Sequence, residues 1–204
     1  MDFNETLNQL NLKSEVVAYA IVVLAVLLIL LVNRRRLLLR FQEWRIERCL
    51  KQIGIEQIRN LVCPDGIDGF YNIDRLALIG DAVLLISYKP YDGNIYCAER
   101  ISEWTQVVGR KSYKFRNPLF ELDNQLTSLR LLIGNAPLRG FLFFNHSALF
   151  PKGHPDSVLN PENIPDKFLT ANCGTPGAEI RAAWEQLKSH QKEASGNLRI
   201  GVKT

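Results

Sequence analysis

The chain has 204 residues, of which 47% are hydrophobic and 23% charged, and its formal net charge is +4. This length allows one ordinary domain with a small appendage. The charged fraction is close to the average for folded proteins, which excludes wholesale disorder and collagen-like or coiled-coil fibres. Four cysteines are too few for a disulfide framework in a chain of this length.

An uninterrupted apolar segment lies near the N-terminus. Residues 16–32 contain no charged or strongly polar side chain. That stretch is at the lower end of the length that crosses a bilayer, and its neighbours Ser14 and Asn33 extend it to the usual ~20 residues. A helix satisfies its own backbone groups, as the hydrocarbon core requires. The sequence therefore predicts a single-pass transmembrane helix over residues 16–33, preceded by a short tail over residues 1–15.

The charges on the two sides of this segment predict its orientation. Residues 1–32 carry a net charge of −2, residues 33–51 carry +5, and residues 52–204 carry only +1. The positive-inside rule places the N-terminus outside and the remainder in the cytoplasm. Residues 34–54 consist of good helix formers ending at a glycine, and predict a basic juxtamembrane helix. We expect its first arginines to contact anionic lipid head groups rather than nucleic acid: Arg34, Arg35, Arg36 and Arg40.

A cytoplasmic location also bears on the cysteines. The four cysteines include no C-x-x-C pair, and none of the three histidines is close to a cysteine in the sequence. A structural zinc site is therefore not expected, and the cysteines are interpreted as partly buried free thiols.

A β-rich stretch follows the basic helix. Residues 58–62, 70–79 and 82–86 have the composition of strands, and turn residues separate them at 64–66 and 80–81. A further turn at 91–94 precedes residues 95–96, which we expect to pair back on the third strand. The pattern predicts a β-meander.

Residues 118–133 have clear signals for a helix. Asn117 can cap it, Pro118 fits the first helical position, and Gly134 follows its end. Residues 141–145 predict a buried strand, which makes helix and strand a crossover. Residues 151–176 predict a long loop, residues 178–194 a second helix, and the last ten residues a loose tail or an edge strand. The fold class is therefore α/β (mixed α+β), with one central mixed sheet flanked by helices, a domain core over 55–150 and a C-terminal part over 151–204.

Several of these segments resemble a known family. Residues 72–76 read Asn-Ile-Asp-Arg-Leu and residues 85–89 read Leu-Ile-Ser-Tyr-Lys; Gly93, Trp104 and Asn117-Pro118-Leu119 follow in order. Over residues 47–145 this order and spacing resemble the NERD (nuclease-related) domain of the PD-(D/E)xK nuclease superfamily. The resemblance implies a restriction-endonuclease-like fold and a bacterial protein, for which the membrane would be the inner membrane.

The resemblance also implies a metal site. Hydrolysis of a phosphodiester is assisted by a divalent ion that neutralises charge on the phosphate, and Mg²⁺ prefers carboxylate ligands. The matching positions make Asp74 the first carboxylate and Lys89 the lysine that orients or deprotonates water. Glu47 resembles the glutamate at the start of the family pattern and is a weaker candidate ligand. Asp74 also fits an acid that pairs with Arg75 or Lys89.

The sequence departs from the family at polar positions. Ser87 stands where the family has the second carboxylate, and a neutral hydroxyl cannot compensate the charge of a divalent ion. Glu121 and Gln125 also replace the glutamine and histidine expected on the helix. These changes, within a retained apolar framework, predict a fold whose chemistry has lapsed. Asp92, Glu99 or Glu121 could supply the missing carboxylate, although each also fits a solvated surface acid.

Other candidate sites are weaker. Pro64 and Asp65 reproduce the letters PD of the PD-(D/E)xK motif. Asp65 lies in a Pro-Asp-Gly turn, however, and need not face the sheet. No phosphate-binding glycine loop is present in the sequence. Lys111, Lys114 and Arg116 alternate with aromatic residues and form a candidate nucleic-acid contact, or else a solvated loop.

These observations leave three functions open. The one we favour is a membrane-anchored, non-catalytic interaction or scaffold subunit that has no cofactor and binds other protein subunits. The alternatives are a tethered, Mg²⁺-dependent DNA or RNA nuclease and a non-catalytic nucleic-acid-binding module. The near-neutral charge of residues 52–204 argues against both alternatives, because phosphate contacts require a basic surface.

Overall fold

The computed structural model describes the backbone of residues 3–64 and 69–200, and the side chains in these ranges except 3–18, 20, 21, 35, 37 and 192–200. The turn around Asp65 lies outside the described residues. The chain divides into two compact units, residues 1–45 and residues 46–204. Each unit is described by itself.

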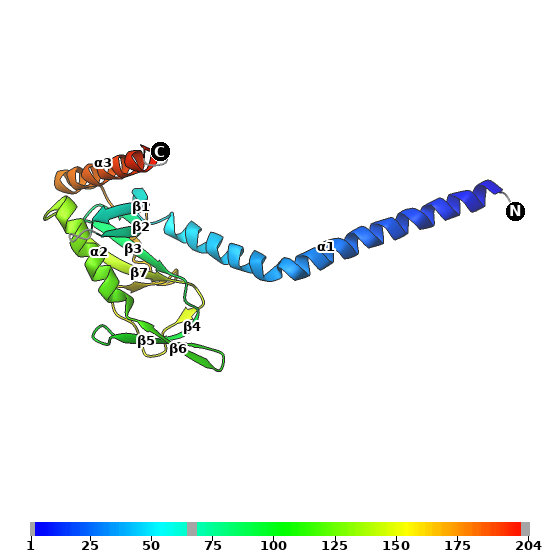
Figure 1. Cartoon of the computed structure of the whole chain (residues 1–204), viewed down its shortest axis with the longest axis horizontal. Coiled ribbons are helices and arrows are strands. Elements are labelled where there is room, and N and C mark those ends of the chain that lie inside the picture. Colours follow the sequence, from blue (N-terminus) through cyan, green and yellow to red (C-terminus); the bar gives the residue numbers. More distant parts are fainter. Residues whose placement is uncertain (1–2, 65–68, 201–204) are drawn as a thin grey trace. The chain divides into compact units, whose positions relative to one another are not determined.

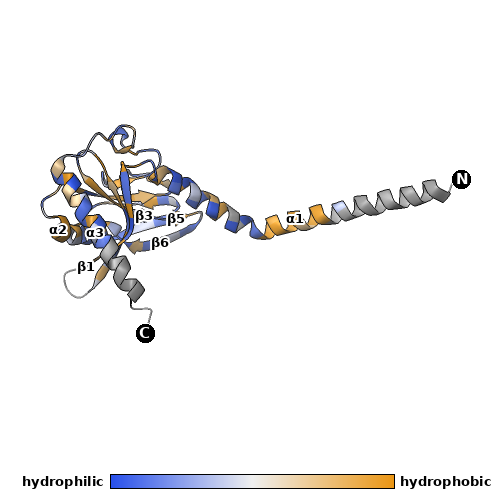
Figure 2. Cartoon of the chain, turned by 90° about the horizontal axis from the view of Figure 1, so that it is seen from above, coloured by the Kyte–Doolittle hydropathy of each residue, from blue (hydrophilic) through white to orange (hydrophobic). Residues whose placement is uncertain are grey.

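The first unit is one continuous helix that belongs to α1 (Phe3–Leu50). Residues 3–15, which we expected as a tail, are helical. Every side chain from Val22 to Val32 is apolar and exposed, and Figure 2 shows this stretch in orange ahead of the blue arginine segment. Within the described residues no helix is long and apolar enough to cross a membrane. The predicted span includes residues 16–18, 20 and 21, whose side chains are outside the description.

The second unit contains a five-stranded mixed sheet with the order β1-β2-β3-β7-β9. β1, β2 and β3 are antiparallel neighbours, and β3, β7 and β9 run parallel. This confirms the predicted mixed sheet and the crossover that returns the chain to the sheet beside β3 (Figure 1). The strands are β1 (Glu56–Pro64), β2 (Phe70–Leu78), β3 (Val83–Lys89), β7 (Leu138–Phe144) and β9 (Val158–Leu159).

A separate four-stranded sheet has the order β6-β5-β4-β8. Our expectation of a single sheet was therefore wrong, as was the pairing of residues 95–96 with the third strand. Those residues pair with β5 instead, because Gly93 has a φ of +79° and lets the Val107 carbonyl approach where a Cβ would lie 2.5 Å away. The strands are β4 (Gly93–Tyr96), β5 (Glu103–Val108), β6 (Lys111–Arg116) and β8 (Ala148–Leu149).

The helix α2 (Pro118–Ile133) follows β6 and begins and ends as predicted. The Asn117 side chain accepts a hydrogen bond from the Leu119 N–H at 2.9 Å, and Gly134 closes the helix with a φ of +62°. Its apolar face packs on β7. Gly140 makes this possible, since a Cβ there would lie 2.8 Å from the side chain of Leu126.

The C-terminal part contains a 3-10 helix, η1 (Asp166–Phe168), and the helix α3 (Ala178–Ile200). We expected a loose tail or an edge strand from residue 195 onward. This prediction is wrong for residues 195–200, because α3 continues to Ile200, and residues 201–204 are outside the description. Trp184 of α3 is fully buried. The helix lies beside β1 in Figure 1, where its side chains hydrogen-bond the strand.

The core of this unit has two parts, one on each face of the five-stranded sheet. One part joins apolar side chains of the sheet with those of α2, α3 and the second sheet. The other joins the opposite sheet face with residues 46–53 and Phe168. All four cysteines are free, and Cys63 and Cys173 are buried. Burial raises the pKa of the Cys63 thiol to about 11.

Candidate functional site

The C-terminal half of β3 supplies the first side chains of the site. Successive side chains of a strand point to opposite faces, so Leu85, Ser87 and Lys89 share one face. Leu85 packs in the same core as α2, which identifies this face as the one beneath that helix. Ser87 is buried, with only 3% of its surface exposed. The residues at the second-carboxylate and lysine positions therefore do lie on one side of the sheet.

Lys89 makes an ion pair with the helix above it. Its Nζ lies 2.9 Å from Glu121 Oε2, and the two side chains are 16% and 52% exposed. Glu121 is in the first turn of α2, three residues after the first helical residue. The positive charge of Lys89 is thus compensated by a carboxylate from the helix.

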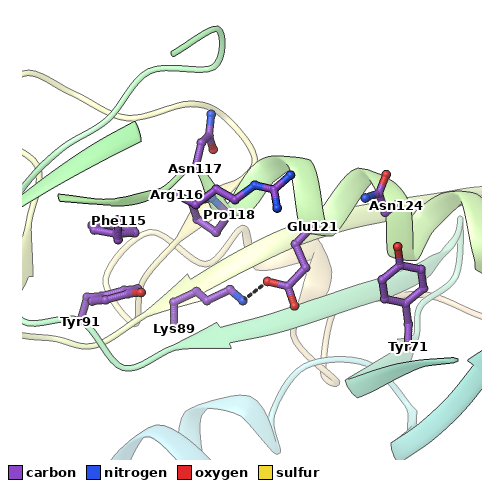
Figure 3. Close-up of a pocket in the computed structure, with 9 residues that line it drawn as sticks. All are labelled: Tyr71, Lys89, Tyr91, Phe115, Arg116, Asn117, Pro118, Glu121 and Asn124. Atoms are coloured by element: carbon purple, nitrogen blue, oxygen red, sulfur yellow. Dashed lines mark hydrogen bonds and ion pairs between the residues drawn. The ribbon is translucent and has the colours of Figure 1, made fainter. Parts of the chain in front are cut away.

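A pocket of about 360 Å³ opens at this ion pair. Figure 3 shows Lys89 reaching Glu121 while the Arg116 guanidinium extends to the same side of the pocket. Tyr91 and Phe115 form an aromatic wall with ring centroids 4.2 Å apart. Among the described residues no carboxylate pairs with Arg116. The pocket is lined by Tyr71, Lys89, Tyr91, Phe115, Arg116, Asn117, Pro118, Glu121 and Asn124.

Asp74 does not line this pocket. It is exposed on β2, at a break in the ladder between the pairs Arg59–Arg75 and Leu61–Ile73. Asn60, opposite it, has a φ of +52°. On the side of β3, the last residue pair in the β2–β3 register is Arg75–Ile86. Asp74 and Ser87 are each one residue beyond this pair. Asp74 and Ser87 are therefore next to each other in the strand register.

Glu47 is engaged by two arginines. One carboxylate oxygen pairs with Arg59, and the other lies 2.6 Å from Arg75 Nη2. Arg75 is buried and also donates to Gln57 Oε1 at 2.5 Å. Burial lowers the pKa of Arg75, and the nearby Glu47 carboxylate opposes that shift. Glu47 therefore serves as the counter-ion of a buried arginine in this structure.

The donor set does not fit the Mg²⁺ that the resemblance implies. Within the described parts of the chain, no three His, Cys, Asp or Glu residues are close enough to hold a metal ion. Asp92 accepts hydrogen bonds from Asn145, at 2.9 Å, and from Ser147. Glu99 is exposed and outside the pocket lining. A hard divalent ion would meet one exposed aspartate and a serine here, which cannot neutralise its charge.

The comparisons with known proteins identify the family of the domain. The nuclease-related domain, NERD, matches residues 39–148, more than half of the chain. The chain belongs to the NERD family. It is also similar to an uncharacterized protein of Bacillus anthracis, pXO1-01, with 31% identity over 61 residues. That match covers 30% of this chain and 29% of the relative, so the chain spans less than a third of that protein's length. No solved structure matches the chain.

Gln125 occupies the helix position where the NERD pattern often has histidine. It is 4% exposed, and its Nε2 reaches the Asn72 carbonyl only at 3.5 Å. Its Oε1 is the one buried side-chain oxygen or nitrogen without a hydrogen-bond partner among the described residues. An unsatisfied buried acceptor usually costs about 1–3 kcal/mol. The polar site beneath α2 of this NERD domain is therefore incompletely satisfied.

Three pocket residues were not predicted from the sequence. Tyr71, Tyr91 and Asn124 line the pocket together with residues that were. The spacing of Asn117, Glu121 and Asn124 does carry a signal, because residues at i, i+4 and i+7 lie on one helix face. The tyrosines carry no such signal, since their positions depend on how the strands pair.

The remaining predicted residues are on exposed surfaces. Lys111 and Lys114 belong to β6, and Lys114 Nζ lies 3.3 Å from Glu103 Oε2 on β5. Arg34, Arg36 and Arg40 are exposed on α1, and the side chain of Arg35 is outside the description. Lipid and nucleic-acid contacts of these residues stay predictions.

Proposed function

We propose that this NERD domain is a non-catalytic binding or scaffold subunit whose nuclease chemistry has lapsed. The observation that carries the proposal is the ion pair of Lys89 with Glu121 beside the buried Ser87. A lysine that assists metal-bound water needs a metal held by carboxylates on its own face of the sheet. Here that face presents Ser87, and within the described part of the chain the acid that pairs with Lys89, Glu121, comes from the helix.

A carboxylate at the helix does not replace the missing ligand. Glu121 is already compensated by Lys89, so a divalent ion would have to compete with that ammonium group. The unpartnered Oε1 of Gln125 is a neutral acceptor and adds no charge. Because one of the two metal-binding carboxylates is missing, we favour a domain that has lost catalysis and retains a binding role.

The second candidate function is a metal-dependent nuclease or a nucleic-acid-binding module. Lys89 is retained, and Arg116 lines the pocket without a carboxylate partner among the described residues. Both could contact a phosphate. The near-neutral charge of residues 52–204 opposes this candidate, because non-specific affinity for nucleic acid comes mainly from many cationic contacts.

A cleavage assay separates the non-catalytic subunit from the metal-dependent nuclease. The full chain in mild detergent is incubated with single- and double-stranded DNA and RNA, in Mg²⁺ and in Mn²⁺, beside Lys89→Ala and Asp74→Asn. We expect the unaltered protein to cleave no faster than the variants. Cleavage that both substitutions abolish would assign the domain to the active nucleases.

We further propose that α1 tethers the domain to a membrane, with the N-terminus outside and the domain in the cytoplasm. A helix that is apolar on all sides and has no partner is typical of a lipid environment. All described side chains from Val22 to Val32 are apolar and exposed, and Arg34, Arg36 and Arg40 follow on the same helix. In a bacterial cell this membrane would be the inner membrane.

Carbonate extraction of membranes tests the tether. The chain should stay in the pellet, whereas Leu27→Arg with Leu28→Arg should release it, because a charged residue at mid-bilayer is costly. Leu131→Arg, at an exposed position of α2, is the matched control and should stay bound. Release of the unaltered chain would refute the tether without affecting the proposal for the domain.

A further inference from the structure

The strand β6 forms an open edge of the four-stranded sheet. Among the described strands it pairs with β5 alone, through a register that runs from Val108–Lys111 to Glu103–Arg116. Gly109, with a φ of +60°, closes this hairpin as the first residue of a two-residue turn. All residues of β6 except Phe115 are exposed. An exposed edge of this length is a template for pairing with another strand.

The hydrogen bonds identify which backbone groups face outward. The Asn117 N–H donates to the Ser102 carbonyl at 2.9 Å, so this pair is a bonded one. Bonded and non-bonded pairs alternate along an antiparallel ladder. The N–H and C=O groups of Ser112, Lys114 and Arg116 therefore face away from β5.

The side chains of those three residues share one face of the hairpin, because they are two residues apart. Lys114 and Arg116 make that face basic. Lys111, Tyr113 and Phe115 point to the other face, where Phe115 packs against Trp104 and Tyr113 is 49% exposed. β6 contains no acidic residue, and the Lys114–Glu103 pair is long and exposed on both sides. The edge thus offers two cations on one face and an exposed aromatic ring on the other.

We propose that β6 binds an extended acidic peptide segment of a partner protein as an added strand. Acidic side chains at positions i and i+2 of the peptide lie opposite Lys114 and Arg116, and the apolar residue on the other side of the acid opposite Lys114 packs on Tyr113. Opposite charges and aromatic–apolar pairs are favourable in cross-strand positions. Arg116 also lines the pocket, so the peptide end beside it lies at the pocket mouth. This inference rests on the proposed role as a binding module and names the chemistry of its partner.

A peptide fits this edge better than a nucleic acid does. The outward backbone groups of β6 are both donors and acceptors, and an extended peptide offers both in return. A phosphate backbone offers only acceptors and would leave the outward carbonyls unpaired. The alternation of basic and aromatic faces also has the two-residue period of a strand.

The test uses the full chain in mild detergent and fluorescence anisotropy of labelled peptides. The probe is a peptide about six to eight residues long in which glutamate alternates with valine. One control peptide has the same residues in two blocks, and another has lysine in place of glutamate. Lys114→Glu and Arg116→Glu remove the charge complementarity, and Lys152→Glu, in the loop after Phe150, is the matched charge reversal away from this edge.

A backbone variant tests the added strand itself. Ser112→Pro removes an outward N–H and leaves the β5–β6 ladder intact, whereas Ser112→Thr keeps the N–H. Thermal unfolding of each variant verifies that the domain is folded. If Ser112→Pro does not fold, an N-methyl group on alternate peptide residues blocks the same hydrogen bonds from the peptide side.

We expect the alternating acidic peptide to bind, and Lys114→Glu, Arg116→Glu and the blocked backbone each to weaken binding about tenfold. Equal binding of the block peptide, or insensitivity to the backbone change, would overturn the proposal. Tighter binding of single-stranded DNA or RNA that the same substitutions abolish would overturn it in favour of nucleic acid. The cleavage assay is independent of the peptide measurement. Nuclease activity would refute the proposed loss of catalysis, and the peptide measurement would still decide whether β6 binds an acidic strand.

Discussion

Lys89 Nζ lies 2.9 Å from Glu121 Oε2, so this lysine at the end of β3 is paired with a carboxylate from α2 rather than from its own strand. Two residues earlier on the same face stands the buried Ser87. The ion pair compensates the charge of the half-buried Lys89 without a metal ion.

Glu47 should be important for stability rather than for chemistry. Glu47→Gln leaves the buried Arg75 guanidinium without its counter-ion, and we expect it to lower the free energy of unfolding by about 2 kcal/mol, since Glu47 is itself one-third exposed. Arg59→Gln, at the more exposed partner, should cost about 0.5 kcal/mol. Denaturant unfolding measures both. Equal effects of the two substitutions would contradict this account of Arg75.

Glu56 should fasten α3 to β1. Its carboxylate pairs with Arg181, lies 2.5 Å from Lys188 Nζ, and accepts from Trp184 Nε1 at 3.0 Å. Glu56→Gln should lower the free energy of unfolding by about 1 kcal/mol, a modest value because a third of the side chain is exposed. Glu185→Gln, which removes only the exposed pair of Lys188, is the control and should have less than half that effect.

The same carboxylate gives a pH dependence with a defined sign. The hydrogen bond from Lys188, with those from Arg181 and Trp184, lowers the pKa of Glu56 from 4.5 to about 2. A lowered pKa in the folded state stabilises the protein above pH 4.5, and this contribution is lost as the pH falls towards 2. The difference in unfolding free energy between the unaltered protein and Glu56→Gln should therefore shrink across this interval. A difference that is constant from pH 6 down to about pH 3 would show that the pKa is not lowered.

Gln125 should be dispensable for stability. Gln125→Met removes the unpartnered Oε1 and keeps the volume, so we expect the free energy of unfolding to rise by about 1 kcal/mol. Gln125→Glu, which places a charge at the same buried position, should lower it. Thermal and denaturant unfolding report both. A loss of more than about 1 kcal/mol in Gln125→Met would mean that the amide makes a hydrogen bond essential to the fold.

Much of the fold could be predicted because local signals and burial agree. Asn117, Pro118 and Gly134 mark the ends of α2 in the sequence, and the structure has the helix at those ends. Four strands of the five-stranded sheet (β1, β2, β3 and β7) are apolar enough to be recognised, whereas the short β9 lies within residues 151–176, which we wrongly expected to be loop throughout. The β5–β6 hairpin could not be recognised, because β6 is mostly polar and exposed and β5 is only half apolar, so that the hairpin depends on the turn at Gly109 and on pairing with β4.

The site was predictable only where it depends on strand periodicity. Ser87 and Lys89 are two residues apart, and their common face follows from that spacing alone. The pairing of Lys89 with Glu121 depends on where α2 crosses the sheet, which Gly140 and the crossover connection determine. The engagement of Glu47 by Arg75 likewise depends on residues far apart in the chain.

The proposed loss of the metal site is tested most directly by titrating the protein with Mn²⁺ in a calorimeter. Ser87→Glu with Glu121→Gln, which returns the acid to the strand and frees Lys89, serves as the comparison, and Asp74→Asn in that background as its control. We expect no saturable binding below ~1 mM for the unaltered protein and a site in the double variant that Asp74→Asn abolishes. A saturable Mn²⁺ site in the unaltered protein that Asp74→Asn removes would contradict the account.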